Sequence, residues 1–236
     1  AGSIAACMEY PHNRPYTADD LVRIITLLRD PVNGCPWDKV QTHTSIRMNF
    51  LEEAYEAVDA LDLDDPVLMC EELGDVLMQV AFHTCMEQET GRFTWEQVCD
   101  GVCQKLIERH PNIFGTQPGY EGITDWDALK NKEKGRRTLA DDLESVPRAM
   151  PALMRAAKLQ KRAARHGAAL QGADAAALAD AAENLQTAQP ASAQAEQAVG
   201  ELLFAAANLA RQAGVDPEQA LQKANEAFCT AAGPVA

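Results

Sequence analysis

The sequence predicts an all-α protein made of two helical units. Apolar residues recur at spacings of three and four along the chain, whereas the alternation typical of strands is scarce. Charge and alanine are unevenly distributed. Residues 1–150 carry 14 basic and 27 acidic residues, whereas residues 151–236 carry 7 and 8 and include 30 alanines. We therefore expect an acidic first half and an alanine-rich second half.

The first half is expected to contain four main helices. Thr17 is a suitable N-cap for the first, and Pro66 suits the first turn of the third. Thr94 and Gln97 form a capping box that opens the fourth. These helices cover about residues 18–28, 44–63, 66–89 and 94–109.

The segment between the halves, residues 111–146, is expected to be mostly loop. One short helix is predicted near 126–134. The second half then predicts four further helices that are punctuated by glycines, with Gly200 inside one of them. They cover about residues 147–165, 174–189, 193–213 and 217–231.

The composition argues against several functional classes. The net charge of −14 repels nucleic acid and anionic lipid at long range. No apolar run reaches the roughly 18 residues of a membrane span, and residues 1–16 lack the basic-then-apolar pattern of a signal peptide. The cysteines include no CxxC pair, which favours reduced thiols. We therefore expect a cytoplasmic protein with no nucleic-acid and no membrane partner.

Acidic residues form a distinctive pattern on the second and third predicted helices. Glu52, Glu53 and Glu56 share one face of the second helix, which taken alone is typical of a solvated surface. Glu72 and Asp75 stand one turn apart on the third helix, which is apolar nearly all round and is therefore expected to be buried. Buried carboxylates need partners, yet the third helix contains no lysine or arginine.

A hard divalent cation would resolve this shortage of basic partners. Oxygen ligands alone favour Mg²⁺, with Mn²⁺ as an alternative. A di-iron bundle needs ExxH motifs and a zinc protease needs HExxH, and neither motif is present. Two antiparallel helices joined by a short turn would place Glu53, Glu56, Glu72 and Asp75 around one or two ions.

Several motifs then appear in order along residues 18–135. They are Leu28–Pro31, Gly34–Asp38, Gln41–His43, an EExxE motif at 52–56, an ExxD motif at 72–75 and a KxxxRHPxxFG motif at 105–115. Together they resemble the MazG-type nucleoside triphosphate pyrophosphohydrolases. The resemblance implies an all-α fold, usually a tight homodimer, and Mg²⁺-dependent cleavage of the α–β phosphoanhydride of nucleoside triphosphates. The products would be a nucleoside monophosphate and pyrophosphate, in a house-cleaning role against non-standard nucleotides.

The resemblance also assigns roles to individual residues. It makes Glu53, Glu56, Glu72 and Asp75 the metal ligands, and it makes Glu52 the residue that orients or deprotonates the attacking water, so that Glu52 and Glu53 are the catalytic pair. It also implies two pairs of substrate-binding residues. Lys105 and Arg109 would contact phosphate, and Trp37 and Asp38 would help to bind the base or to order the loop. From spacing alone, Lys105 and Arg109 are equally consistent with a surface ion-pair ladder.

The resemblance divides the chain into a catalytic domain at 17–135, a linker at 136–150 and a degenerate second MazG-like domain at 151–231. In that second domain only Glu183 and Glu201 remain of the expected acids, which are too few for a metal site, so we expect no hydrolysis there. The alternative function is a nucleotide-binding or regulatory interaction protein that has lost catalysis. The intact acids of the first half favour the enzyme.

Overall fold

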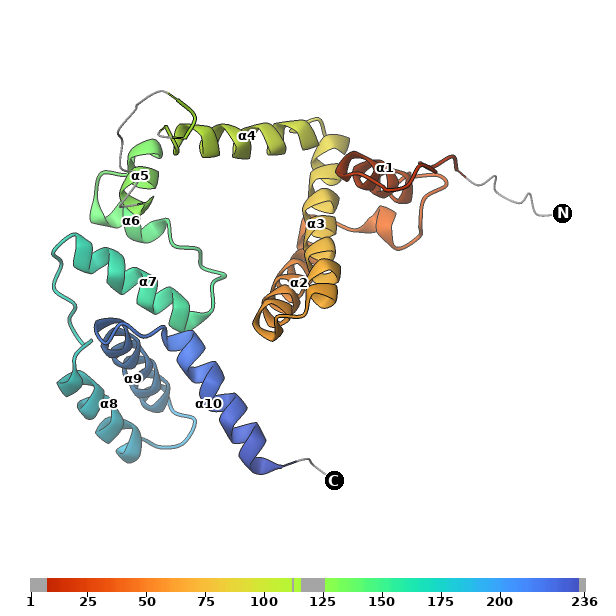
Figure 1. The fold of residues 1–236 in the computed structure, drawn as a ribbon. Coiled ribbons are helices and arrows are strands. Elements are labelled where there is room, and N and C mark those ends of the chain that lie inside the picture. Colours follow the sequence, from red (N-terminus) through yellow and green to blue (C-terminus); the bar gives the residue numbers. More distant parts are fainter. Residues whose placement is uncertain (1–7, 112, 116–125, 234–236) are drawn as a thin grey trace. The chain divides into compact units, whose positions relative to one another are not determined.

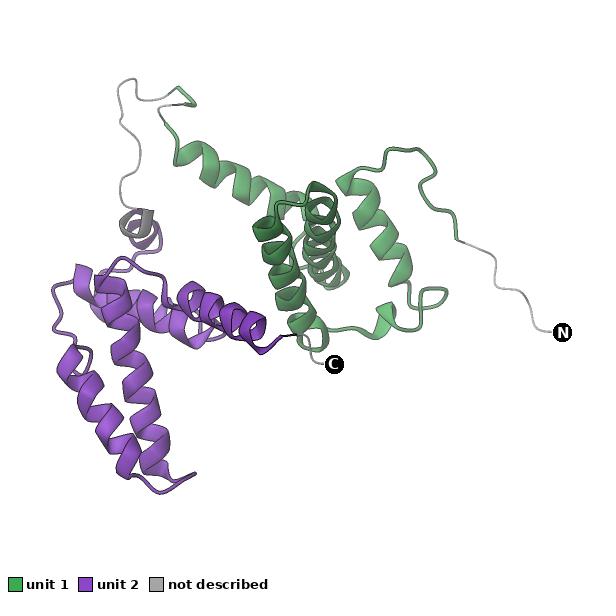
Figure 2. Ribbon diagram, turned by 60° about the horizontal axis from the view of Figure 1, so that its bottom comes forward, with its two compact units in different colours: residues 1–122 green, residues 123–236 purple. Residues whose placement is uncertain are grey.

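The computed structural model describes residues 8–111, 113–115 and 126–233, and it is all-α (Figure 1). Over these residues the chain forms ten α-helices and one short 3₁₀ helix, with no strand among them. The chain divides into two compact units, residues 1–122 and 123–236 (Figure 2). The boundary lies before the short helix at 126–133, so this helix belongs to the second unit rather than to the first.

The first unit is built around an antiparallel pair of helices. α2 and α3 are joined by the two-residue turn Asp64–Asp65, and both α1 and α4 pack against α3 (Figure 1). The helices are α1 (Ala18–Leu28), η1 (Asp38–Val40), α2 (His43–Leu63), α3 (Pro66–Glu89) and α4 (Trp95–Glu108).

The ends of these helices follow from side-chain caps. Thr17 and Thr94 cap α1 and α4 as predicted, and Thr42 forms a capping box that starts α2 one residue earlier than expected. Asp64 closes α2 in the left-handed conformation with φ 53°, and the Asp65 carboxylate accepts hydrogen bonds from the first free N–H groups of α3. The tight turn fixes how residues of α2 face those of α3.

The hydrophobic core of the first unit lies at the end of α3 remote from this turn. It draws on all four helices and is formed by Ile25, Ile46, Ala81, Phe82, Cys85, Met86 and Trp95. The other half of α3 differs from expectation, because Val67, Leu73 and Leu77 are 76%, 52% and 40% exposed. The prediction that the whole third helix is buried is therefore wrong for its first half. Helical periodicity shows which side chains are apolar but not whether the same chain covers them.

Arg29 fixes the loop that follows α1. Its guanidinium donates to both carboxylate oxygens of Glu89, at 2.5 and 2.8 Å, and to the backbone oxygens of Asp38 and Gln41. Gly34 is needed in the same loop, since a Cβ there would lie 2.4 Å from the carbonyl oxygen of Asp30. The loop is therefore held against α1 and α3 before α2 begins.

The second unit packs largely through small side chains. α8 and α9 form an antiparallel pair in contact with α7, and the alanines buried there, such as Ala181 and Ala205, allow the helices to approach closely. Gln160 and Asn208 are buried and donate to backbone carbonyls. The helices are α5 (Trp126–Glu133), α6 (Leu139–Glu144), α7 (Ala152–Arg165), α8 (Ala175–Thr187), α9 (Ala193–Gln212) and α10 (Pro217–Ala232).

Two elements of this unit differ from the sequence prediction. Residues 139–144 form α6 instead of loop, because Thr138 and Asp141 make a capping box that was not recognised. α7 begins at Ala152 and not at 147, since Pro151 occupies its N-cap position. The other helix ends agree with the prediction within a few residues.

Asp142 is the most deeply buried charge of the second unit, with no exposed surface. Its carboxylate pairs with Arg162 at 3.0 Å, Arg165 at 2.6 Å and His166 at 3.0 Å. Arg162 also donates to the Asp142 carbonyl oxygen at 2.6 Å. Burial alone would raise the pKa of Asp142, but hydrogen bonds from Asn131, Arg165 and His166 and the charge of Arg162 lower it. The network joins α6 to α7.

Two sequence expectations concern features outside the packing of the helices. The six described cysteines form no disulfide with one another, which is consistent with reduced thiols. Cys7 lies outside the described residues. No helix among the described residues has the length and apolar character needed to cross a membrane.

Replacing Asp142 by asparagine is expected to destabilise the second unit by about 3 kcal/mol, because breaking a buried ion pair leaves an uncompensated charge. The loss should appear as faster amide hydrogen exchange in α6 and α7. Glu144→Gln is a matched control, since Glu144 is exposed two residues away. Equal exchange in the two variants would contradict the stabilising role of this network.

Candidate functional site

Three glutamates converge near the turn end of the α2–α3 pair. Glu53 and Glu56 stand one turn apart on α2, and Glu72 faces them from α3. One carboxylate oxygen from each lies within 4.8 Å of the others. Glu53 and Glu72 are partly buried and Glu56 is exposed, so the cluster is open to solvent on one side.

Negative charges in this cluster act on one another. Desolvation, followed by the charges of Asp75, Glu56, Glu72 and Glu52, raises the pKa of Glu53 above its usual value. Desolvation and the charges of Glu56, Asp75 and Glu71 raise the pKa of Glu72. Asp75, one turn beyond Glu72 on α3, is therefore close enough to belong to the same group of acids.

The four acids Glu53, Glu56, Glu72 and Asp75 have no basic partner within the described part of the chain, since none of them forms an ion pair there. Carboxylates that repel one another without a counter-charge fit the donor set of a hard divalent cation. The cluster therefore has the composition of a metal site made only of oxygen ligands.

The spacing of the oxygens can be compared with magnesium coordination. Mg²⁺ binds oxygens at about 2.0–2.1 Å, so two ligands on opposite sides lie about 4.2 Å apart. The three carboxylate oxygens lie within 4.8 Å of one another, and rotation of a glutamate side chain can adjust their spacing. The exposed Glu56 has room for this rotation.

The predicted phosphate-binding residues lie on a different helix. Lys105 is in the last turn of α4 and Arg109 is its C-cap. Figure 1 shows α4 leaving the end of α3 that lies opposite the α2–α3 turn. A single copy of the chain thus places Lys105 and Arg109 on an element that does not pack against the acidic end of the helix pair.

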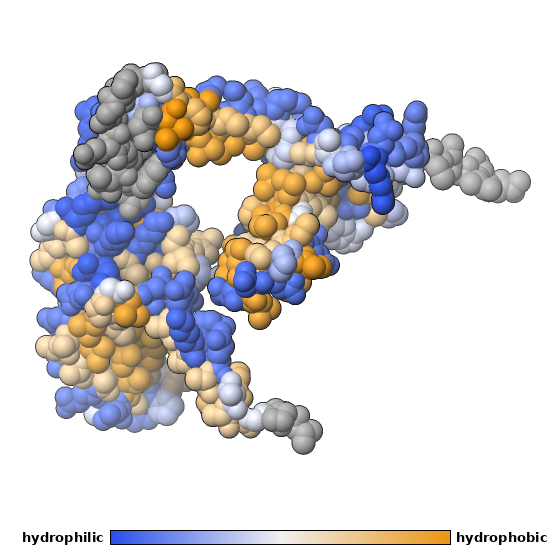
Figure 3. Space-filling view, viewed as in Figure 1, coloured by the Kyte–Doolittle hydropathy of each residue, from blue (hydrophilic) through white to orange (hydrophobic). Residues whose placement is uncertain are grey.

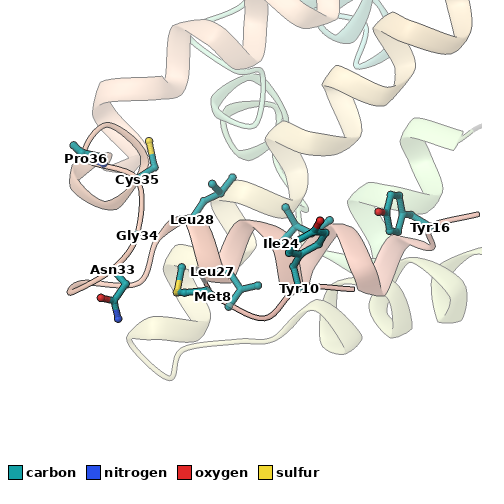
Figure 4. Close-up of a pocket in the computed structure, with 10 residues that line it drawn as sticks. All are labelled: Met8, Tyr10, Tyr16, Ile24, Leu27, Leu28, Asn33, Gly34, Cys35 and Pro36. Atoms are coloured by element: carbon teal, nitrogen blue, oxygen red, sulfur yellow. The ribbon is translucent and has the colours of Figure 1, made fainter. Parts of the chain in front are cut away.

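Trp37 and Asp38 belong to the loop that Arg29 anchors. Trp37 precedes the 3₁₀ helix and is 57% exposed, and the backbone oxygen of Asp38 accepts a hydrogen bond of 2.7 Å from Arg29. The same loop borders an apolar pocket of about 550 Å³, which is also lined by Ile24 and Leu28 of α1 and by Tyr10 of the N-terminal segment (Figure 4). The loop is thus firmly held while the Trp37 side chain stays accessible.

A histidine pair at the start of α2 was not predicted from the sequence. His43 Nδ1 lies 2.7 Å from His83 Nδ1 and its Nε2 lies 2.5 Å from Glu87, which also pairs with Arg92. The ring centroids are 5.0 Å apart with nearly parallel planes. The centroid distance equals the Nδ1–Nδ1 distance plus the distance from each ring centre to its own nitrogen, so the two rings lie edge to edge in nearly one plane. One Nδ1 therefore donates a hydrogen bond and the other accepts it.

These residues border a hollow of about 620 Å³ that also includes Phe50 and Phe93. Desolvation and the neighbouring His43 lower the pKa of His83, which favours its neutral form. The pairing of these histidines could not be predicted from their spacing in the sequence, because His43 and His83 are separated by 40 residues. The pairing depends on the antiparallel register that the α2–α3 turn sets.

Comparison with known proteins gives a consistent result. Residues 41–114 match the MazG nucleotide pyrophosphohydrolase domain, which includes all three clustered glutamates. The chain is 41% identical over 219 residues to the Escherichia coli nucleoside triphosphate pyrophosphohydrolase, covering 89% of this chain and 83% of the relative. It is 39% identical over 212 residues to the Thermotoga maritima nucleoside triphosphate pyrophosphohydrolase/pyrophosphatase MazG, covering 89% and 82%.

A more distant relative is the Mycobacterium tuberculosis nucleoside triphosphate pyrophosphohydrolase, at 35% identity over 151 residues, covering 62% of this chain and 46% of the relative. The family domain at residues 41–114 contains the α2–α3 pair and its acidic cluster. The chain therefore belongs to the MazG nucleotide pyrophosphohydrolase family.

Proposed function

We propose that the chain hydrolyses nucleoside triphosphates at the α–β phosphoanhydride, releasing a nucleoside monophosphate and pyrophosphate. The observation that carries this proposal is the cluster of Glu53, Glu56 and Glu72, whose oxygens lie within 4.8 Å of one another without a basic partner among the described residues. Its place in the family domain supports the reaction class. Removal of non-standard nucleotides is the role that we propose for the reaction.

The proposed metal ligands are Glu53, Glu56, Glu72 and Asp75, with Mg²⁺ as the ion and Mn²⁺ as its substitute. A bound Mg²⁺ supplies positive charge that offsets the phosphate oxygens and orients the substrate for in-line attack. Glu52 lies next to Glu53 on the exposed side of α2, where its carboxylate accepts the proton of the attacking water.

Substrate contacts are proposed for two further pairs of residues. Lys105 and Arg109 would neutralise phosphate oxygens, with the arginine as a bidentate donor. Trp37 offers an exposed aromatic face for a base, and Asp38 holds the loop through its backbone contact with Arg29. Since Lys105 and Arg109 do not lie on the helix pair, we propose that a second subunit completes the pocket.

We propose a homodimer formed through the exposed apolar side chains of α2 and α3. Apolar surface gathers over this helix pair (Figure 3), and a patch of this kind marks an interaction site. We propose that a second copy of the chain covers this surface. In a two-fold dimer the α2–α3 pair of one subunit would pack against the α2–α3 pair of the other. The exposed members are Tyr55, Val58, Leu61, Leu63, Val67, Leu73 and Leu77.

The second unit is proposed to be a degenerate MazG-like domain that does not hydrolyse. Glu183 and Glu201 lie on α8 and α9, which pack together, but two carboxylates cannot supply four ligands. The Glu201 carboxylate instead accepts a hydrogen bond of 2.8 Å from Gln197. This unit is expected to contribute packing surface.

Glu72→Gln is expected to lower kcat/KM for pyrophosphate release by about a hundredfold or more, since even residues behind metal ligands cost 10–100-fold when changed. The measurement is pyrophosphate release from a panel of standard and modified nucleoside triphosphates in Mg²⁺. Glu201→Gln is the matched control and should retain full turnover. Nucleotide binding without any release by the wild type would support the regulatory alternative, and loss of turnover in Glu201→Gln would contradict the inactive second unit.

Metal-free stability should depend on pH through the same carboxylates. Because the pKa values of Glu53 and Glu72 are raised on folding, the contribution of these two groups to stability is fully present below the ordinary glutamate value of 4.5 and is lost as pH rises through the raised values. In EDTA, Glu72→Gln should therefore unfold at a higher temperature than the wild type at pH 7, and the difference should vanish near pH 4.

Mg²⁺ should reverse the order of the unfolding temperatures, so that the wild type becomes more stable than Glu72→Gln. At 100 times its Kd the ion stabilises the wild type by about 2.7 kcal/mol, whereas Glu72→Gln should gain much less. Glu71→Gln, on the adjacent exposed position, is expected to change little in either condition. A lower unfolding temperature of metal-free Glu72→Gln at pH 7 would show that repulsion does not govern this cluster.

The double substitution Leu73→Gln/Leu77→Gln is expected to convert the dimer to a monomer, because it removes apolar surface at the proposed interface. Light scattering after gel filtration measures the mass. Val215→Gln/Leu221→Gln is the control, since both residues are 48% exposed in the second unit. A monomeric wild type, or a dimeric double variant, would overturn the proposed interface.

A further inference from the structure

A basic cavity lies in the second unit. Its volume is about 480 Å³, within the range of small-ligand pockets. No acidic side chain is among the described residues that line it, although the chain as a whole has a net charge of −14. The lining residues are Asn131, Lys132, Gly135, Arg136, Arg137, Arg165 and His166.

The positive charge on one side of this cavity is not neutralised by neighbours. Residues 130–137 read KNKEKGRR, in which Glu133 is the single acid, and Glu133 does not line the cavity. Lys132, Arg136 and Arg137 form no ion pair with any residue in the described ranges. Three cations thus face the cavity with their charge available.

The opposite side of the cavity is held in place by a buried acid. The Asp142 carboxylate accepts hydrogen bonds from Arg165 at 2.6 Å and from His166 at 3.0 Å, and it pairs with Arg162 behind them. One negative charge therefore orients two arginines and a histidine. These contacts hold Arg165 and His166 in a fixed arrangement on this side of the cavity, which preorganises donors for an anion.

The backbone N–H groups around the cavity are already used. Those of Gly135 and Arg136 donate to the carbonyl oxygens of Lys132 and Asn131, at 3.2 and 2.8 Å. That of Arg137 donates to Asp141 at 3.1 Å. An anion must therefore be recognised by side chains, and guanidinium groups match phosphate oxygens in paired geometry.

We propose that this cavity binds an anion with a pyrophosphate group, either free pyrophosphate or the phosphate tail of a nucleotide. Three uncompensated cations suit a ligand with several negative charges better than a single phosphate. The described lining offers cations and no carboxylate, so binding of this anion should not require a divalent cation. The site is one for recognition and not for hydrolysis.

The test is isothermal titration calorimetry of the full chain with inorganic pyrophosphate in EDTA, where the acids of the first unit have no metal with which to attract an anion. Wild type should bind one pyrophosphate with an affinity that falls as salt rises. Arg136→Gln/Arg137→Gln should bind at least about tenfold more weakly, because charge-assisted hydrogen bonds are lost. The backbone bonds of both residues survive this change.

Arg148→Gln/Lys223→Gln is the charge-matched control, since both residues are exposed and lie outside the cavity, and its affinity should stay within about twofold of wild type. Glu72→Gln should also retain binding, which separates this proposal from the one for hydrolysis. No metal-free binding by wild type, or equal weakening in the control, would overturn the site.

A second titration identifies the source of the ligand. An α,β-non-hydrolysable nucleoside triphosphate is titrated in the same buffer into wild type and into Arg136→Gln/Arg137→Gln. If the nucleotide binds the wild type more tightly than pyrophosphate does, and the double variant loses this binding, the site is assigned to a nucleotide tail. Weaker binding than pyrophosphate assigns it to the free anion.

Discussion

Repulsion between carboxylates is the constraint on which the first unit depends. Glu53, Glu56 and Glu72 bring negative charge together at one end of the α2–α3 pair, and desolvation together with the neighbouring negative charges raises the pKa values of Glu53 and Glu72. A helix pair loaded in this way would separate unless it were held elsewhere. The core around Ile46 and Phe82, at the other end of α3, supplies that hold.

The division of α3 into two halves follows from this arrangement. Its second half is largely buried and includes Glu87, which forms an ion pair with Arg92 and lies 2.5 Å from His43 Nε2. Its first half carries the unneutralised acids beside apolar side chains that remain exposed. The structure thus separates the part of the helix that stabilises the fold from the part that we propose contacts a cation and a second subunit.

The sequence predicted well what depends on neighbouring residues. Caps such as Thr17 and Thr94, and the shared face of Glu53 and Glu56, follow from local rules of the helix. It predicted poorly what depends on coverage by distant segments, such as the exposure of Leu73 or the contact between His43 and His83. The short helix α6 was missed because six residues give too little periodicity to recognise.

The two units treat buried charge in opposite ways, and this explains why the net charge of the chain says little about its ligands. The first unit gathers acids that lack basic partners in the described structure, which suits a cation. The second gathers Lys132, Arg136 and Arg137, which form no ion pair within the described ranges, beside the network of the buried Asp142. In a chain with an overall charge of −14, we therefore propose one place for a metal ion and another for an anion. What each place binds is decided by local compensation, since interactions between exposed charges fade beyond about 10 Å in ordinary salt.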